Sequence, residues 1–167
     1  MKKLILILLL VTSSCTLDQT NFEENATVKK IIDGDTYLID VNGSEEKIRL
    51  LGIDYPDLTK DRITNFLDLG VVKNKVQDCY KKGKEDLEKN LVGKNMIIIR
   101  DPNEKDRDKY KRLLRYAEFN NTDIGAWLLQ NGYARFYDPT NQLCNRCIYY
   151  HLIYSNITDS KIGCLWE

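Results

Sequence analysis

Two short runs of alternating apolar and polar residues near the start of the chain predict a β-hairpin. The alternating apolar positions are Tyr37, Ile39, Val41, Ile48 and Leu50. Asn42-Gly43 joins the two runs, and this dipeptide is typical of two-residue hairpin turns because both positions adopt positive φ. Asp33-Gly34-Asp35 forms a turn before the hairpin, and Pro56 ends the pattern after it because proline cannot donate a ladder hydrogen bond. Carboxylates are therefore expected at the strand ends.

The middle of the chain predicts a loop, a helix and a strand. The segment from Leu58 to Gln77 has no clean apolar period and is expected to be an inserted loop, with a short helical turn around Ile63–Leu69. An amphipathic helix is expected from Asp78 to Gly93, since two leucines lie four residues apart and glycine is typical of a helix end. Met96–Ile99 predicts a buried strand.

The second half of the chain predicts a charged loop, one further strand and two helices. Asn103–Arg112 is nearly all charged and is expected to be a loop, and Leu113–Phe119 is expected to be a strand. Thr122 is a suitable N-cap for a helix over Ile124–Gln130, which ends at Asn131-Gly132. A last helix is expected to begin near Asn141, and its inward positions are expected to be Leu143, Ile148 and Leu152.

These elements together predict a single α+β domain. There are five strand candidates, of which the first is the segment from Val28 to the turn at Asp33-Gly34-Asp35. A helix lies between the third and the fourth, and the remaining helices follow the fifth, which gives about three helices in all. A chain of 167 residues is long enough to bury one core.

The first 15 residues are typical of a lipoprotein signal peptide. Lys2 and Lys3 precede an apolar run from Leu4 to Val11, which is too short to span a membrane. Small residues precede Cys15, which is expected to be lipidated and to anchor an exported protein to a membrane of the cell envelope. If Cys15 instead joins a disulfide, the protein is secreted. Residues 16–25 are polar and are expected to be a flexible tether, and 26–167 the folded domain.

Charge and histidine content restrict the class of function. The chain has 25 basic and 25 acidic residues, and without the leader its net charge is about −2, which argues against tight stoichiometric binding to nucleic acid. An enzyme that releases its product remains compatible with this balance. The single histidine, His151, is expected to have a surface or packing role, and its isolation excludes nuclease mechanisms that need two histidines.

The remaining four cysteines allow three interpretations. An even number in an exported chain favours two disulfides, and we expect Cys79 to pair with the segment that holds Cys144 and Cys147, while Cys164 ties the tail. The Cys-x-x-Cys spacing also fits half of a four-cysteine zinc site. A thioredoxin-like redox pair is the third interpretation.

Acidic side chains crowd around one arginine, Arg49, in the first third of the sequence. They are Asp33, Asp35, Asp54 and Asp57. Carboxylates at neighbouring strand ends repel one another unless a positive charge lies between them, and a hard divalent cation with oxygen ligands supplies it. Taken alone, an Asp-Gly-Asp segment is more often a turn than a metal site.

Three segments together resemble the staphylococcal nuclease (thermonuclease) family. They are Ile32-Asp33-Gly34-Asp35-Thr36, then the segment from Arg49 to Asp57, and then Asp108-Lys109-Tyr110-Lys111-Arg112. Their order and spacing match the family from about Ala26 onward. The resemblance implies a five-stranded OB-fold barrel.

The resemblance also implies roles for individual residues. Calcium would be held by Asp35, Asp54 and the backbone carbonyl of Tyr55, with Asp33 acting through water. The catalytic residues would be Arg49, Asp57 and Arg112, and the nucleotide-binding residues Lys109, Tyr110 and Tyr137. The chain departs from the family's pattern at three positions, which are Tyr55 for threonine, Asp57 for glutamate and Lys111 for glycine.

The resemblance implies an exported, calcium-dependent endonuclease, expected to be a monomer, that cleaves DNA and RNA and leaves 3′-phosphates. The alternative is a surface lipoprotein that keeps the barrel without catalysis and binds nucleic acid or a protein partner. The shorter Asp57 favours this alternative, whereas the intact set of Asp35, Asp54, Arg49 and Arg112 favours the enzyme.

Overall fold

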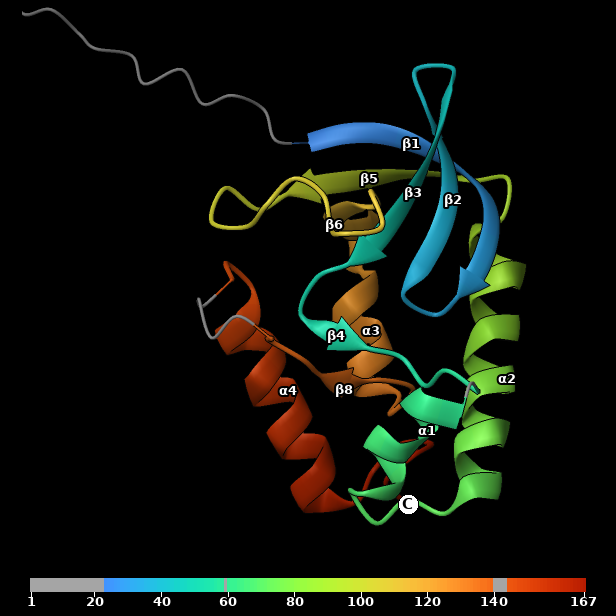
Figure 1. The fold of residues 1–167 in the computed structure, drawn as a ribbon, viewed down its shortest axis with the longest axis vertical. Coiled ribbons are helices and arrows are strands. Elements are labelled where there is room, and N and C mark those ends of the chain that lie inside the picture. Colours follow the sequence, from blue (N-terminus) through green and yellow to red (C-terminus); the bar gives the residue numbers. More distant parts are fainter. Residues whose placement is uncertain (1–22, 59, 140–143) are drawn as a thin grey trace, which may run out of the picture.

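A closed five-stranded barrel forms the upper half of the molecule in the computed structural model, which describes residues 23–58, 60–139 and 144–167 (Figure 1). Its strands are β1 (Glu23–Asp33), β2 (Thr36–Val41), β3 (Ser44–Leu50), β5 (Asn95–Arg100) and β6 (Leu113–Phe119). They pair in the order β3-β2-β1-β5-β6, and a parallel pairing of β3 with β6 closes the barrel. This is the OB-fold arrangement that the sequence resemblance implied.

The hairpin of β2 and β3 forms as its sequence pattern predicts. Asn42 and Gly43 form the turn with φ of 53° and 84°. The alternating apolar residues of both strands are buried in the barrel core.

β1 begins at Glu23 and pairs with β5 from there, so the strand includes three residues of the predicted tether. The signal peptide, Cys15 and most of the tether lie outside the described residues.

Short strands extend this framework toward the lower half of the molecule. β4 (Ile53–Asp54) pairs with β8 (Arg135–Phe136), and β7 (Thr122–Asp123) continues from β6. The β4–β8 pairing lies just below the barrel, at the level of α3 (Figure 1).

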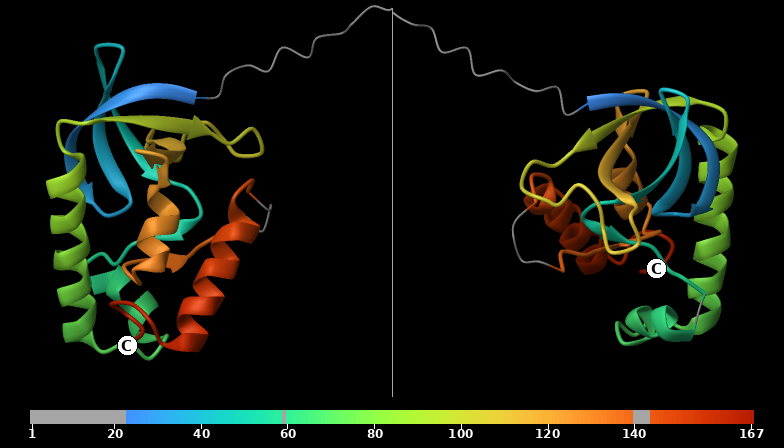
Figure 2. Two further views of the ribbon diagram at one scale, coloured as in Figure 1. Left: turned by 180° about the vertical axis from the view of Figure 1, so that it is seen from behind. Right: turned by 45° about the horizontal axis from the view of Figure 1, so that its top comes forward.

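Four helices lie in the described part of the chain, one more than the sequence pattern indicated. They are α1 (Lys60–Leu67), α2 (Lys73–Leu91), α3 (Ile124–Gln130) and α4 (Cys147–Ser160). α2 runs along one side of the molecule and α3 lies below the barrel, between α2 and α4 (Figure 2). None of the helices among these residues is long and apolar enough to cross a membrane.

The prediction of an inserted loop over 58–77 was wrong, although the short helical turn predicted around Ile63–Leu69 overlaps α1. This segment contains all of α1 and the first turn of α2, which begins at Lys73 rather than Asp78. Phe66 and Val76 are fully buried in the common core, so tertiary burial of a few apolar residues stabilises helices whose own period is weak. The predicted helix end holds, since α2 stops at Leu91 and Gly93 has a φ of 76°.

α3 has the predicted bounds, but its N-cap is Asp123 rather than Thr122, because the Asp123 side chain accepts a hydrogen bond from the Ala126 backbone N–H.

The inward face predicted for the last helix was also wrong. Ile148 and Leu152 are 66% and 57% exposed, and Tyr150 and Ile157 are buried in their place. α4 begins at Cys147, which bonds to Cys144, and this link sets which side of the helix faces the protein. Asn141 and Leu143, the other two residues of that prediction, lie outside the described residues.

Two disulfides connect the four cysteines, in a different pairing from the predicted one. Cys79 of α2 bonds to Cys164 near the C-terminus, and Cys144 bonds to Cys147. The predicted link from α2 to the 144–147 segment is therefore wrong. With every thiol of these four in a disulfide, the four-cysteine zinc interpretation fails as well. The Cys144–Cys147 disulfide closes the turn directly before α4, and the Cys79–Cys164 disulfide links α2 to the C-terminal tail.

Candidate active site

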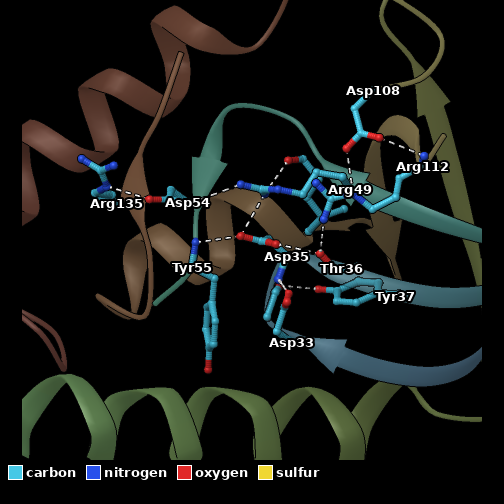
Figure 3. Close-up of polar contacts among 12 residues, drawn as sticks. Asp33, Asp35, Thr36, Tyr37, Arg49, Asp54, Tyr55, Asp108, Arg112 and Arg135 are labelled. Carbon is cyan, nitrogen blue, oxygen red and sulfur yellow. Dashed lines mark hydrogen bonds and ion pairs between the residues drawn. The ribbon is translucent and has the colours of Figure 1, made fainter. Parts of the chain in front are cut away.

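Arg49 is a buried arginine on β3 whose guanidinium bridges two carboxylates. One terminal nitrogen lies 2.9 Å from Oδ2 of Asp35 and also donates to the Leu50 carbonyl, and the other lies 3.5 Å from Oδ1 of Asp54 (Figure 3). Asp35 comes from the turn before β2 and Asp54 from β4, so three separate segments meet at this arginine. The positive charge of Arg49 is consequently fixed in position.

Asp35 accepts hydrogen bonds on both of its oxygens. Oδ1 accepts from the Thr36 hydroxyl at 2.9 Å, and Oδ2 accepts from the Tyr55 backbone N–H at 2.8 Å in addition to its ion pair with Arg49. Burial raises the pKa of Asp35 from 3.8 to about 6, and the Arg49 guanidinium offsets only part of this shift. The positive charge of Arg49 therefore compensates only part of the cost of burying the ionised Asp35 carboxylate.

Arg112 belongs to the same network through Thr36. Its Nη1 donates to the Thr36 hydroxyl at 3.2 Å, and its Nε lies 2.7 Å from Oδ2 of Asp108. A continuous chain of contacts thus runs from Arg112 through Thr36 and Asp35 to Arg49 and on to Asp54 (Figure 3). The structure brings the two arginines and the two carboxylates of the sequence prediction into one site.

Asp108 organises the tight turn that carries Lys109 and Tyr110, two of the predicted nucleotide-binding residues. Its Oδ1 accepts from the backbone N–H groups of Tyr110 and Arg112, and its carbonyl accepts from the Lys111 N–H. Lys111 occupies the left-handed region with a φ of 64°, which explains why a glycine suits this position. The turn geometry therefore persists although this chain carries lysine there.

A cavity of about 820 Å³ lies beside these residues. Arg49 and Arg112 both line it, together with Lys109, Tyr110 and Tyr137, the three residues predicted to bind a nucleotide. Tyr110 is 63% exposed, and the Lys109 ammonium and the Arg112 guanidinium lie 5.1 Å and 5.4 Å from its ring centre, so two cations meet at this ring on the edge of the cavity. Asp35 and Asp54 do not line the cavity themselves, and they contact it through Arg49.

Tyr55 joins the site to α2 through its side chain. The ring is buried and points toward α2, where the hydroxyl donates to the Tyr80 carbonyl (Figure 3). Gly34 lies against this ring, since a Cβ at position 34 would stand 2.1 Å from Cδ2 of Tyr55. Tyrosine in place of the family's threonine is therefore part of the packing of this chain, and the Asp33-Gly34-Asp35 turn accommodates it.

Asp33 and Asp57 lie toward α2 rather than in the lining of the cavity. Oδ1 of Asp33 accepts from the Asp35 N–H at 3.1 Å, which fixes the turn. Burial raises the pKa of Tyr80, and the charges of Asp33 and Asp57 raise it further, so both carboxylates lie within electrostatic reach of that phenol. Asp57 is half-buried.

Arg135 is a third arginine of the site, and no motif or spacing in the sequence indicated it. Its Nε lies 2.9 Å from Oδ2 of Asp54, on the side of that carboxylate away from Arg49 (Figure 3). Asp54 and Arg135 are register partners in the β4–β8 ladder. Asp54 and Arg135 are 81 residues apart in the sequence, and only the pairing of two strands of two residues each brings them together. No apolar periodicity indicates such a pairing.

The donor set suits a hard divalent cation. Asp35 and Asp54 offer buried carboxylate oxygens and Tyr55 a neighbouring carbonyl, and oxygen donors are the ligands that calcium prefers. The raised pKa of Asp35 indicates that additional positive charge would be stabilising there. Among residues 23–58, 60–139 and 144–167, no three acidic, histidine or cysteine side chains form a metal site by themselves, so the carbonyl and solvent would have to complete the ligand set.

The sequence profile of the family described as staphylococcal nuclease homologue matches residues 47–152, more than half of the chain. The chain belongs to the staphylococcal nuclease family. The matched residues include Arg49, Asp54, Arg112 and Arg135, so the third arginine lies inside the family domain rather than in an appended segment.

The chain is similar to proteins of Staphylococcus, Methanocaldococcus and Bacillus species. The chain is 31% identical over 121 residues to a thermonuclease of Staphylococcus intermedius, with 71% of this chain and 64% of that protein covered. It is 38% identical over 120 residues to the uncharacterized protein MJ1439 of Methanocaldococcus jannaschii, with 66% and 58% covered. It is 30% identical over 121 residues to the endonuclease YncB of Bacillus subtilis, with 71% and 52% covered. The match thus spans between about half and two thirds of each relative.

Proposed function

We propose that this protein is a calcium-dependent endonuclease that hydrolyses phosphodiester bonds of DNA and RNA and leaves 3′-phosphates. One observation carries the proposal: Arg49 and Arg112 line the same cavity and are joined through Asp35 and Thr36. Membership of the staphylococcal nuclease family, and relatives named thermonuclease and endonuclease, support it.

The two arginines suit the charge that develops during phosphodiester hydrolysis. Water attacks phosphorus, the bond from phosphorus to the 5′ oxygen breaks, and the phosphate stays on the 3′ oxygen. Negative charge increases on the phosphoryl oxygens in the transition state, and guanidinium groups stabilise it by charge-assisted hydrogen bonds. Arg49 and Arg112 are already held in place by carboxylates, so little reorganisation is needed when the charge develops.

Calcium would be held by Asp35, Asp54 and the carbonyl of Tyr55, with Asp33 acting through water. When bound, it would add positive charge next to the phosphoryl group. Asp57 would orient the attacking water, although it is one methylene shorter than the family's glutamate. Lys109 would pair with a terminal phosphate, and Tyr110 and Tyr137 would stack near the nucleotide.

The proposed location is the cell envelope. Residues 1–15 would direct export, lipid on Cys15 would anchor the protein in a membrane, and residues 16–25 would link the anchor to the domain. Without lipidation the protein would be secreted. We infer from the family resemblance that it acts as a monomer.

The test is cleavage of single-stranded DNA and RNA by purified protein that begins at Thr16, with calcium and then with chelator. We expect cleavage in calcium that chelator abolishes. Replacing Arg49 or Arg112 with lysine should lower the rate by about 100-fold, since lysine cannot reproduce the fork of donors. Arg100→Lys, on an exposed arginine of β5, is the matched control and should keep the wild-type rate.

The position of Asp57 favours one second candidate. Because Asp57 does not line the cavity, a non-catalytic protein that binds nucleic acid or a protein partner on the same barrel is the alternative. Binding of single-stranded DNA without cleavage under any calcium concentration would select it. Cleavage that chelator does not affect would contradict calcium dependence while leaving the nuclease activity in place.

A further inference from the structure

Arg135 is paired with Asp54, one of the two carboxylates that a divalent cation at this site would share with Arg49. Its Nε lies 2.9 Å from Oδ2 of Asp54, while Oδ1 of Asp54 lies 3.5 Å from Arg49. Asp54 is 7% exposed and thus carries two guanidinium groups on a single buried negative charge. Each oxygen of this carboxylate already faces a positive charge.

Aromatic rings fix the Arg135 guanidinium in this position. Its Cζ lies 5.5 Å from the ring centre of Phe66 in α1 and 5.5 Å from that of Tyr137, which follows β8. Contacts of this kind between a cation and a ring face are favourable. The ladder between β4 and β8 places Arg135 directly opposite Asp54. The ion pair is therefore built into the fold and is not a chance contact of a mobile side chain.

A cation that binds Asp54 meets Arg135 as a competitor. A cation held between Asp35 and Asp54 approaches Oδ1, the oxygen on the Arg49 side, while Arg135 stays 2.9 Å from Oδ2 of the same carboxylate. The cation and the guanidinium therefore share one negative charge, and their repulsion at short range is weakly screened in a buried site. Arg49 cannot be the whole cause of such competition, because its contact with Asp54 is longer and its closest carboxylate is Asp35.

We propose that Arg135 is an internal competitor for the metal-binding carboxylate Asp54, so that it lowers the calcium affinity of the free protein. The Phe66 and Tyr137 rings hold the guanidinium against Oδ2, so that its charge opposes a calcium ion that approaches Oδ1. Arg135 thereby acts as a positioning residue that sets the calcium concentration at which the site is half occupied. This inference rests on the proposed calcium dependence.

The test is calcium binding by titration calorimetry on the disulfide-intact protein without nucleic acid. Arg135→Gln should bind calcium about tenfold more tightly than the wild type, within the range of typical coupling between sites. Arg135→Lys keeps the charge and should stay closer to the wild-type affinity. Arg100→Gln removes one exposed positive charge from β5 and controls for net charge, so its affinity should not change. Thermal unfolding in chelator checks that each variant is folded.

The opposite sign would overturn the proposal. If Arg135 only orients Asp54 for the metal, Arg135→Gln binds calcium more weakly than the wild type. A calcium affinity of Arg135→Gln equal to that of the wild type would also contradict the competition between Arg135 and calcium for Asp54. A wild-type protein that binds no calcium would remove the calcium dependence together with this inference, whereas calcium binding with an unchanged Arg135→Gln affinity removes this inference alone.

Discussion

The hydroxyl of Tyr55 donates to the backbone carbonyl of Tyr80, so a side chain that begins beside the buried carboxylates ends on α2. Its ring fills the space next to Gly34, in the turn that carries Asp33 and Asp35. The backbone N–H of the same residue donates to Asp35. Tyr55 therefore fixes the position of the acidic turn relative to a helix that the barrel itself does not include.

Two substitutions of Tyr55 should destabilise the protein to different extents. Tyr55→Phe loses one buried hydrogen bond and should lower the free energy of unfolding by about 1 kcal/mol. Tyr55→Thr, the residue typical of the family, also leaves a cavity and should lower it by about 3 kcal/mol or more. Urea unfolding in chelator measures both values. Tyr149→Phe removes a hydroxyl from a half-exposed tyrosine on α4 and should have little effect. Equal losses in Tyr55→Phe and Tyr149→Phe would contradict the role of the link.

Most strands of the barrel could be predicted from the sequence because they carry a local signal. Alternation marks β2 and β3, Asn42-Gly43 fixes their register, and β6 stands between two clear turns. α1 carries only a weak signal, the short helical turn predicted around Ile63–Leu69, since Ile63 and Phe66 are buried by tertiary packing without forming a clean amphipathic period. Local patterns therefore indicated the strands, the family resemblance indicated their closure into a barrel, and contacts between distant segments decided the rest.

The candidate site shows the same division. Asp35, Asp54, Arg49 and Arg112 could be predicted because they lie in segments that match a family motif in order and spacing. Arg135 could not, since only the pairing of β4 with β8 brings it to Asp54. The pairing of the cysteines was mispredicted for a similar reason, as it depends on where the C-terminal tail meets α2.

The two disulfides should contribute unequally to stability. Cys79–Cys164 closes a loop with a sequence separation of 85 residues, and Cys144–Cys147 one of only 3. Loop-closure entropy then predicts that the double serine variant of the first pair loses about 4 kcal/mol and that of the second about 2 kcal/mol. Denaturant unfolding of the two variants compares them directly. A larger loss for the Cys144–Cys147 variant would show that native contacts of that loop outweigh chain entropy.

Acid should destabilise the loop that carries Lys109 and Tyr110. A hydrogen bond from Arg107 is the main cause that lowers the pKa of Glu46 below 4.5. Burial alone would raise the pKa of Asp108, but hydrogen bonds from Arg112 outweigh it and lower that pKa below 3.8. Because both values are lower in the folded than in the unfolded state, the stability that these groups contribute is present above about pH 4.5 and is lost as the pH falls through the folded values.

Urea unfolding at a series of pH values in chelator tests this sign. The free energy of unfolding of Glu46→Gln should fall less steeply below about pH 4.5 than that of the wild type, because the titrating group is gone. Glu45→Gln, at the neighbouring exposed position on β3, is the control and should follow the wild-type curve more closely. Asp35 has a raised pKa and acts in the opposite direction, but it is present in every variant and cancels from the comparison. A steeper acid loss in Glu46→Gln would refute the argument.

Lengthening Asp57 by one methylene should increase the rate of cleavage. A carboxylate that is about 1.5 Å too short is poorly placed to orient water, and misplacement by about 1 Å can cost on the order of 100-fold in rate. Asp57→Glu is therefore expected to raise the initial rate on single-stranded DNA in calcium by about 10-fold to 100-fold. Asp57→Asn should lower it, and Asp159→Glu, an exposed position on α4, should leave it unchanged. An Asp57→Glu rate at or below the wild-type value would mean that another group orients the water, because chain length would then not limit the reaction.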